Sequence, residues 1–183
     1  MWRLFLWLAV GLGVSLASEA FAATDPCQAA GACREIGDVR LPGDEGQSQS
    51  VHVGQTLPWV VDNNVLLFPG ETVVISLPQK QEGQLPMSLV ATGEAAKTRN
   101  LQAGELRFNF EVGDSGMLLI ATSAHPRWLH YMAVMVTPDG APSKTSVCPI
   151  IAGKMAFESW PHGIVQLALT NFIPVGEEEL VCS

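Results

Sequence analysis

Residues 105–140 read ELRFNFEVGDSGMLLIATSAHPRWLHYMAVMVTPDG, and this stretch decides the fold. Within it, Glu105–Val112 alternates strictly between polar and apolar side chains. Because successive side chains of a strand point to opposite faces, this pattern predicts a strand with one face on a core and the other in water. The core face would carry Leu106, Phe108, Phe110 and Val112, and the outer face Glu105, Arg107, Asn109 and Glu111.

A turn and two more strands follow. Gly113–Gly116 favours a tight turn, because glycine accepts positive φ and Asp or Ser side chains bond nearby backbone. Met117–Ala121 is continuously apolar, so we expect a strand buried on both faces and a hairpin over Glu105–Thr122. Leu129–Val136 is apolar on both faces and ends at the turn Thr137–Gly140, and we expect this strand to lie centrally in a sheet.

The rest of the chain has more short strands and no long helical pattern. Strands are expected at Leu57–Val61, Val65–Phe68, Glu71–Leu77, Pro86–Ala91 and Ile164–Thr170, the last extended by Phe172–Val175. Irregular structure is expected over Ala23–Gln49, Leu41–Ser50, Ala141–Ser146 and Phe157–Gly163, with room for one helical turn in Thr92–Gly104. About eight short strands separated by turns predict an all-β fold, an antiparallel β-sandwich of immunoglobulin-like or jelly-roll-like type.

Residues 1–22 have the features of a secretory signal peptide. Arg3 precedes the apolar run Leu4–Ala17, and Ala20-Phe21-Ala22 is a cleavage pattern. The apolar run is short for a transmembrane helix, which needs roughly 20 residues. We therefore expect export to the periplasm or the extracellular space and no stable membrane insertion after cleavage. The mature chain would hold an irregular segment over 23–50 and a single sandwich domain over 51–183.

The chain is acidic, with a formal net charge of −8 at pH 7. Nucleic acids and anionic membranes carry phosphates that such a charge repels. We therefore expect neither as a partner.

Four cysteines, Cys27, Cys33, Cys148 and Cys182, lie in the part of the chain that would be exported. An even number in an oxidising compartment predicts two disulfides. Three pairings exist, and proximity in the sequence favours Cys27–Cys33 with Cys148–Cys182, whereas loop entropy does not choose between them. The cysteine spacings differ from those of a zinc site.

The tetrapeptide Gly113-Asp114-Ser115-Gly116 matches the sequence around the nucleophile of chymotrypsin-like serine proteases. In that family a histidine base and an orienting aspartate precede the serine. The one upstream histidine, His52, lies in Val51-His52-Val53 and lacks the Ala-His-Cys setting of that family. The chain is also short for two barrels, so we interpret Ser115 as a turn residue without a catalytic role.

The four histidines, His52, His125, His130 and His162, form no metal-binding motif. Glu158 and His162 have the i,i+4 spacing of a helix face, but Pro161 and Gly163 argue against a helix there. A blue-copper site would need a histidine shortly after a free cysteine, and none lies between Cys148 and Met155. We expect no metal and no cofactor, while a site assembled from distant strands stays open as an alternative.

Two tryptophans, Trp128 and Trp160, lie beside predicted loops and close to His125 and His162. Such aromatics either stack on sugars and anchor protein partners or simply close the end of a sandwich. The candidate binding residues are therefore Trp128, His125, Trp160 and His162. The expected function is a non-enzymatic binding or accessory module for a protein or a glycan. The alternative is a hydrolase or metal-dependent enzyme with a site assembled from Ser115, Glu158 and His162.

Overall fold

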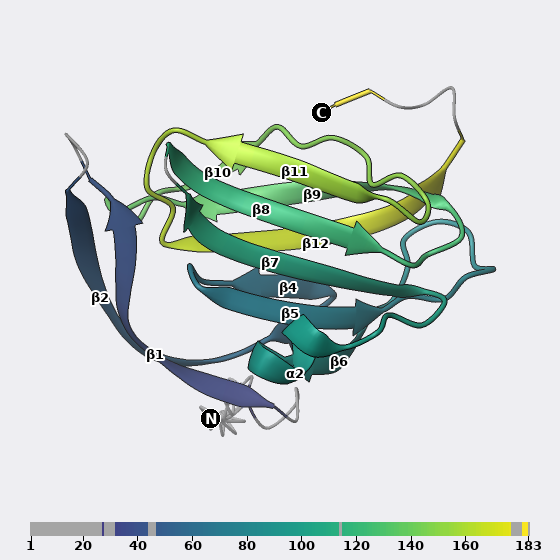
Figure 1. Cartoon of the computed structure of the whole chain (residues 1–183), viewed down its shortest axis with the longest axis horizontal. Coiled ribbons are helices and arrows are strands. Elements are labelled where there is room, and N and C mark those ends of the chain that lie inside the picture. Colours follow the sequence, from purple (N-terminus) through teal and green to yellow (C-terminus); the bar gives the residue numbers. More distant parts are fainter. Residues whose placement is uncertain (1–26, 28–31, 44–46, 114, 177–180, 183) are drawn as a thin grey trace, which may run out of the picture.

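The computed structural model describes residues 27, 32–43, 47–113, 115–176 and 181–182. Two five-stranded sheets pack face to face, and all strand pairings are antiparallel (Figure 1). The predicted all-β sandwich is confirmed, with twelve strands in the described residues where about eight were expected. The predicted signal peptide and its cleavage site lie outside the described residues.

Each sheet is named here after one of its strands. The β9 sheet has the order β10 (Pro142–Thr145), β9 (Trp128–Val136), β12 (Gln166–Val175), β4 (Asn64–Leu67) and β3 (Val60–Val61). The β7 sheet has the order β11 (Met155–Trp160), β8 (Gly116–Ser123), β7 (Glu105–Gly113), β5 (Glu71–Ser76) and β6 (Ser88–Thr92). A helix of six residues, α2 (Gly93–Thr98), contacts β5 and β6, in the region where one helical turn was expected.

The predicted hairpin is present as β7 and β8. Its strands pair from Leu106 opposite Ser123 to Gly113 opposite Gly116. Phe108 and Phe110 are fully buried, as expected, but Val112 is 43% exposed. Val112 lies one pair from the end of the ladder, at the tip of the hairpin, so the expected core face is shorter by one residue.

Strand β8 differs from the expectation of burial on both faces. Met117, Leu119 and Ala121 are buried, whereas Leu118 and Ile120 are partly exposed. The inner residues meet the β9 sheet, and no described element lies over the outer ones (Figure 1). A continuously apolar strand can therefore still have one face at the surface.

The core forms between the two sheets. The ring centroid of Phe172 lies 5.8 Å from that of Phe108 and 5.5 Å from that of Tyr131. The rings of Phe110 and Trp160 meet edge to face at 6.4 Å. Because Phe108 belongs to β7 and Phe172 to β12, each sheet buries its inner face against the other.

The N-terminal part of the sandwich was wrongly expected to be irregular. Strands β1 (Cys33–Pro42) and β2 (Ser48–Pro58) form a long hairpin, and their ends take up both ends of the predicted loop Leu41–Ser50. Ile36, Val39 and Leu41 are buried. The spacing of three between Ile36 and Val39 arises at a register shift between Ile36 and Asp38, so a bulge hides the alternation in the sequence.

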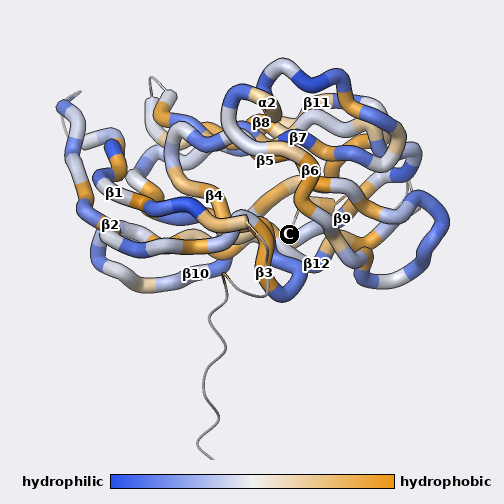
Figure 2. The backbone as a smooth tube through the Cα atoms, turned by 90° about the horizontal axis from the view of Figure 1, so that it is seen from below, coloured by the Kyte–Doolittle hydropathy of each residue, from blue (hydrophilic) through white to orange (hydrophobic). Residues whose placement is uncertain are grey.

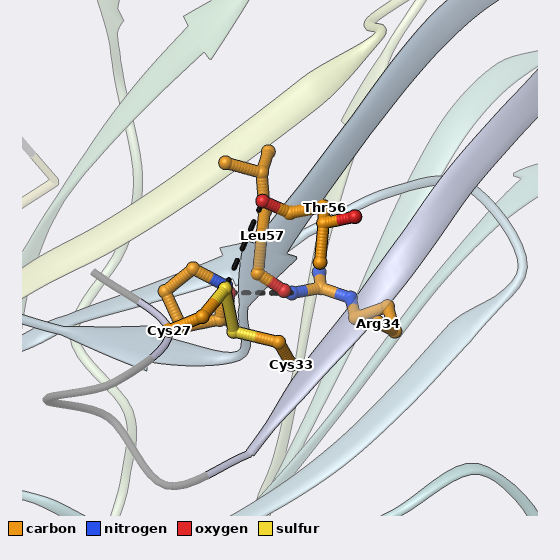
Figure 3. The surroundings of a disulfide bond; sticks show 6 residues. Cys27, Cys33, Arg34, Thr56 and Leu57 are labelled. Atoms are coloured by element: carbon orange, nitrogen blue, oxygen red, sulfur yellow. Dashed lines mark hydrogen bonds between the residues drawn. A yellow bond between two sulfur atoms is a disulfide. The ribbon is translucent and has the colours of Figure 1, made fainter. Parts of the chain in front are cut away.

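Arg34 fastens this hairpin to both sheets. Its guanidinium donates to the two carboxylate oxygens of Glu71 at 2.8 and 2.7 Å, and to the Leu66 carbonyl at 3.0 Å. It also donates to the Leu57 carbonyl at 3.2 Å (Figure 3). The guanidinium carbon lies 3.9 Å from the Trp59 ring centroid. Leu66 belongs to β4 of the β9 sheet and Glu71 to β5 of the β7 sheet. The Arg34 side chain therefore connects the β1–β2 hairpin to both five-stranded sheets.

Both favoured disulfides are formed, Cys27–Cys33 and Cys148–Cys182. The first lies beside Arg34 at the start of β1 (Figure 3). Its Cys27 sulfur is 3.8 Å from the Thr56 carbonyl oxygen, a contact without a donated proton because a disulfide sulfur carries none. The second joins the segment before β11 to the C-terminal residues.

Two further segments expected to be irregular are edge strands. Strand β10 lies in the predicted loop Ala141–Ser146, and β11 overlaps Phe157–Gly163. Strand β10 is polar and carries Pro142 and Lys144, residues that are common at sheet edges because they discourage pairing with another chain. The other expected strands are present with shifted ends, and Leu57–Val61 is divided between β2 and β3.

Candidate functional site

The four predicted binding residues do not form one site. Trp160 is paired with Met117, at the start of β8, whereas His125 follows the end of β8. Trp128 begins β9, next to His125, and His162 follows Trp160. The two Trp–His pairs therefore lie at opposite ends of the sandwich.

His125 and Trp160 have structural contacts. The His125 side chain is fully buried, and its Nδ1 accepts the Arg127 amide hydrogen at 3.2 Å. Its Nε2 lies 3.3 Å from the Pro78 carbonyl oxygen, within hydrogen-bond distance. The Trp160 indole N–H donates to the Thr145 hydroxyl at 2.6 Å, and the side chain is buried at the edge of the core.

The three residues of the alternative catalytic site do not bond to one another among the described residues. The Glu158 carboxylate accepts the Cys148 amide hydrogen at 2.6 Å, and partial burial raises its pKa. The His162 Nε2 lies 3.4 Å from the Met135 sulfur. Ser115 lies in the exposed β7–β8 turn. Within the described part of the chain, no group of three metal-ligating side chains is present.

Close packing requires a glycine at the position after Ser115. Gly116 has a φ of 140°, and a Cβ added there would lie 2.0 Å from the Trp160 carbonyl oxygen. The turn therefore needs a glycine at this position to let β8 approach the end of β11. This steric requirement accounts for the last residue of the tetrapeptide without reference to catalysis.

The outer face of the β9 sheet is largely apolar. The five strands of this sheet contain no aspartate or glutamate, and their basic residues are Lys144 and His130. The alternation that buries Tyr131 and Ala133 turns Met132 and Val134 outward, where they are partly exposed. We call this surface the apolar face. Its outward apolar residues are Val61, Leu66, Trp128, Met132, Val134, Val136, Ala168, Ile173 and Val175, and its outward polar residues are Asn64, His130, Lys144, Gln166 and Thr170.

Register places these side chains in rows across the strands. Val134 is opposite Ala168, which is opposite Leu66, and on the other side Val134 is opposite Lys144. Directly opposite residues share a face, so the row is continuous. Figure 2 colours β3 and β4 orange, whereas much of the β1–β2 hairpin is blue or white. Beside the row, a hollow of about 340 Å³ is lined by His130, Met132 and Lys144 with the residues that follow it.

The outer face of the β7 sheet is different, because it is crossed by a row that changes from polar to apolar. Thr72 on β5 is opposite Asn109 on β7, which is opposite Ile120 on β8, which is opposite Phe157 on β11. A cavity of about 510 Å³ lies over the polar part of the row. We call it the polar groove, and it is lined by Thr72, Lys97, Arg107, Asn109, Glu111 and Ile120 together with Gly70 and Thr122.

Hydrogen bonds hold the floor and wall of the polar groove. The buried Thr72 hydroxyl donates to Asn109 Oδ1 at 2.9 Å, and Asn109 Nδ2 donates to a Glu111 carboxylate oxygen at 2.7 Å. Arg107 donates to the carbonyl oxygens of Ala96 and Arg99 at the end of α2. The helix therefore forms a fixed wall beside the groove, with Lys97 on it.

The sequence pattern did not reveal this groove. The outer face of Glu105–Val112 was expected to meet water. Arg107, Asn109 and Glu111 are partly exposed, but Glu105 is buried and bonded to Arg99, and the neighbours of this face come from β5 and β8 and, beyond β8, from β11. The available signal was the threonine face of Glu71–Leu77, since an outward threonine beside an outward asparagine makes a polar pair in a sheet.

Within the described residues, no helix is both long enough and apolar enough to span a bilayer. Comparison of the chain with protein-family models, with curated proteins and with solved structures gives no match. The two outer faces are therefore the basis on which function can be argued.

Proposed function

We propose that this protein is an exported, non-enzymatic module that binds a protein partner through the apolar face. The supporting observation is that five adjacent strands contain no carboxylate, although the chain carries 18 acidic residues. In antiparallel sheets the face away from the core is usually polar. An apolar outer face is costly in water and is typical of a surface that another molecule covers.

Charge favours a protein over a lipid surface as the partner. The net charge of −8 repels anionic membranes, whereas a protein can match the local charge of the face. The apolar row ends at Lys144. The expected partner presents apolar side chains to Val134 and Ala168 and a carboxylate to Lys144. Trp128, at one end of the face, supplies a large partly exposed side chain of the kind that anchors interfaces.

Export is the second part of the proposal. It is supported by the composition of residues 1–22, and the two disulfides are consistent with an oxidising compartment. Intact-mass analysis of protein from the envelope and the medium should give a mature N-terminus at Ala23. A product that retains Met1 would contradict export by cleavage.

The binding proposal is tested by photo-crosslinking in the native organism. A photoreactive amino acid replaces Val134 on the apolar face or, as a control, Thr56 on the exposed strand β2. The protein captured from Val134 is identified, purified and titrated against the wild type, Val134→Asp and Thr56→Asp. We expect Val134→Asp to weaken binding at least about tenfold and Thr56→Asp to leave it within about twofold.

Three results would contradict the proposal. These are no capture from Val134, capture of a second copy of this chain, and equal binding of the partner to both variants. Circular dichroism and the melting temperature of each variant confirm that the fold is retained.

A further inference from the structure

We infer that the polar groove is a second binding site, and that its ligand is a neutral glycan. The inference does not depend on the protein partner proposed above, because the two surfaces lie on opposite outer faces of the sandwich (Figure 1). It rests on the arrangement of polar and apolar side chains along one cross-strand row and on the charges beside that row.

The polar half of the row matches the hydroxyl groups of a sugar. Asn109 uses one amide hydrogen for Glu111 and accepts one from Thr72. An amide has a second N–H, and a carboxylate has further acceptor positions, so both side chains can serve a ligand as well. Hydroxyl groups donate and accept, and thus fit a site that offers a donor and acceptors side by side.

The apolar half matches the C–H face of a sugar ring. Phe157 is 59% exposed and Met155, two residues before it on the same face, is 58% exposed. Ile120 lies between Phe157 and Asn109 in the row. From Thr72 to Phe157 the row crosses three gaps between strands, which is roughly 14 Å. That length holds more than one sugar ring, with hydroxyls at Asn109 and a ring face at Phe157.

The charges in the groove favour a neutral ligand. Glu111 lines the groove with Lys97 and Arg107, and Glu94 beside Lys97 brings the sum of these four charges to zero. Arg107 already donates to two carbonyl oxygens of the helix region, and the Lys97 ammonium lies 3.8 Å from a Glu94 carboxylate oxygen. An anionic ligand would therefore be repelled by Glu111, and a cationic ligand would be repelled by Lys97 and Arg107.

A peptide fits this groove less well than a glycan. Extended peptides gain most of their affinity from main-chain hydrogen bonds to a sheet edge. The groove lies over β5, β7 and β8, which are paired on both sides within the sheet. The groove therefore offers mainly side-chain groups, which suits a ligand that bonds through its own substituents.

The test is a titration of the mature, disulfide-bonded protein with neutral hexasaccharides, namely maltohexaose, cellohexaose, mannohexaose and chitohexaose. Binding is followed by calorimetry and by NMR shifts of the Asn109 side-chain amide. We expect at least one hexasaccharide to bind in the millimolar range or more tightly and to shift this amide. Phe157→Ala and Asn109→Ala should each weaken that binding about tenfold.

The control is Val112→Ala, which removes an exposed apolar side chain at the hairpin tip, outside the groove. It should bind the sugar within about twofold of the wild type. Phe157 is exposed, so its variant tests the site even where Asn109→Ala loses stability. The inference is overturned if no hexasaccharide binds, if binding leaves Asn109 unshifted, or if Phe157→Ala binds as tightly as the wild type. None of these results bears on capture at Val134.

Discussion

The outer faces of the two sheets show how sheets of the same architecture can differ in chemistry. The β9 sheet has no aspartate or glutamate in any of its five strands, and its outer face is largely apolar. The β7 sheet carries Glu71, Glu105, Glu111 and Glu158 in its strands, and its outer face holds a bonded polar row beside α2. An apolar outer face is suited to a large dry contact, and a bonded polar row is suited to a small hydroxylated ligand. The two sheets therefore share one core and differ in the chemistry of their outer faces.

The largest effect is expected inside the shared core. Phe108→Ala and Phe110→Ala in the β7 sheet, and Phe172→Ala in the β9 sheet, should each lower the free energy of unfolding by about 3–5 kcal/mol. All three side chains are fully buried, and truncation leaves a cavity as well as a lost contact. Chemical denaturation with the disulfides intact measures the effect. If the variants of one sheet lost less than about 1 kcal/mol of unfolding free energy while those of the other lost more, the two inner faces would not form one shared core.

The second largest effect tests whether Arg34 anchors the β1–β2 hairpin to both five-stranded sheets. Arg34→Lys keeps the charge but loses the two-pronged contact with Glu71, and should lower the free energy of unfolding by roughly 2 kcal/mol. Arg40→Lys, on the exposed face of the same strand, is the matched control and should change it by less than about 0.5 kcal/mol. Equal effects in denaturation experiments would mean that Arg34 does not fasten the hairpin.

A smaller effect is expected in the polar row. The alternation of Glu105–Val112 by itself suggests that Asn109→Ala costs less than about 0.5 kcal/mol, as exposed substitutions usually do. From the structure we expect Asn109→Ala to lower the free energy of unfolding by about 1 kcal/mol, because the buried Thr72 hydroxyl loses its acceptor. In a double-mutant cycle with Thr72→Val, the two changes should cost less together than the sum of the single changes. Additive effects would indicate that the bond contributes nothing to stability.

The smallest effect is expected on the apolar face. Val134→Thr adds a hydroxyl at a partly exposed position and should change the free energy of unfolding by less than about 0.5 kcal/mol. Val73→Thr, at a fully buried position of β5, should cost about 1–3 kcal/mol because its hydroxyl has to leave water. Similar losses at both positions would show that the apolar face is covered within the isolated protein.

The sequence by itself determined the elements that depend on local patterns. Alternation in Glu105–Val112 determined a half-buried strand, since a period of two leaves one apolar face whatever the neighbours are. Two glycines around a turn determined the hairpin, and short separations in an exported chain favoured the disulfide pairing that is formed. Local rules failed at Gly37, where a bulge changes the spacing of the buried residues, and at the polar strand β10.

The tertiary structure alone decided which residues meet. Trp128 and Trp160 look equivalent in the sequence, but the antiparallel course of β8 and β11 puts them at opposite ends. Thr72, Asn109, Ile120 and Phe157 are spread over 86 positions of the chain, yet the strand register aligns them in one row. A shift of one residue in any of these pairings would turn a side chain to the other face. Register is set by the summed packing of both sheets, and no local segment contains that information.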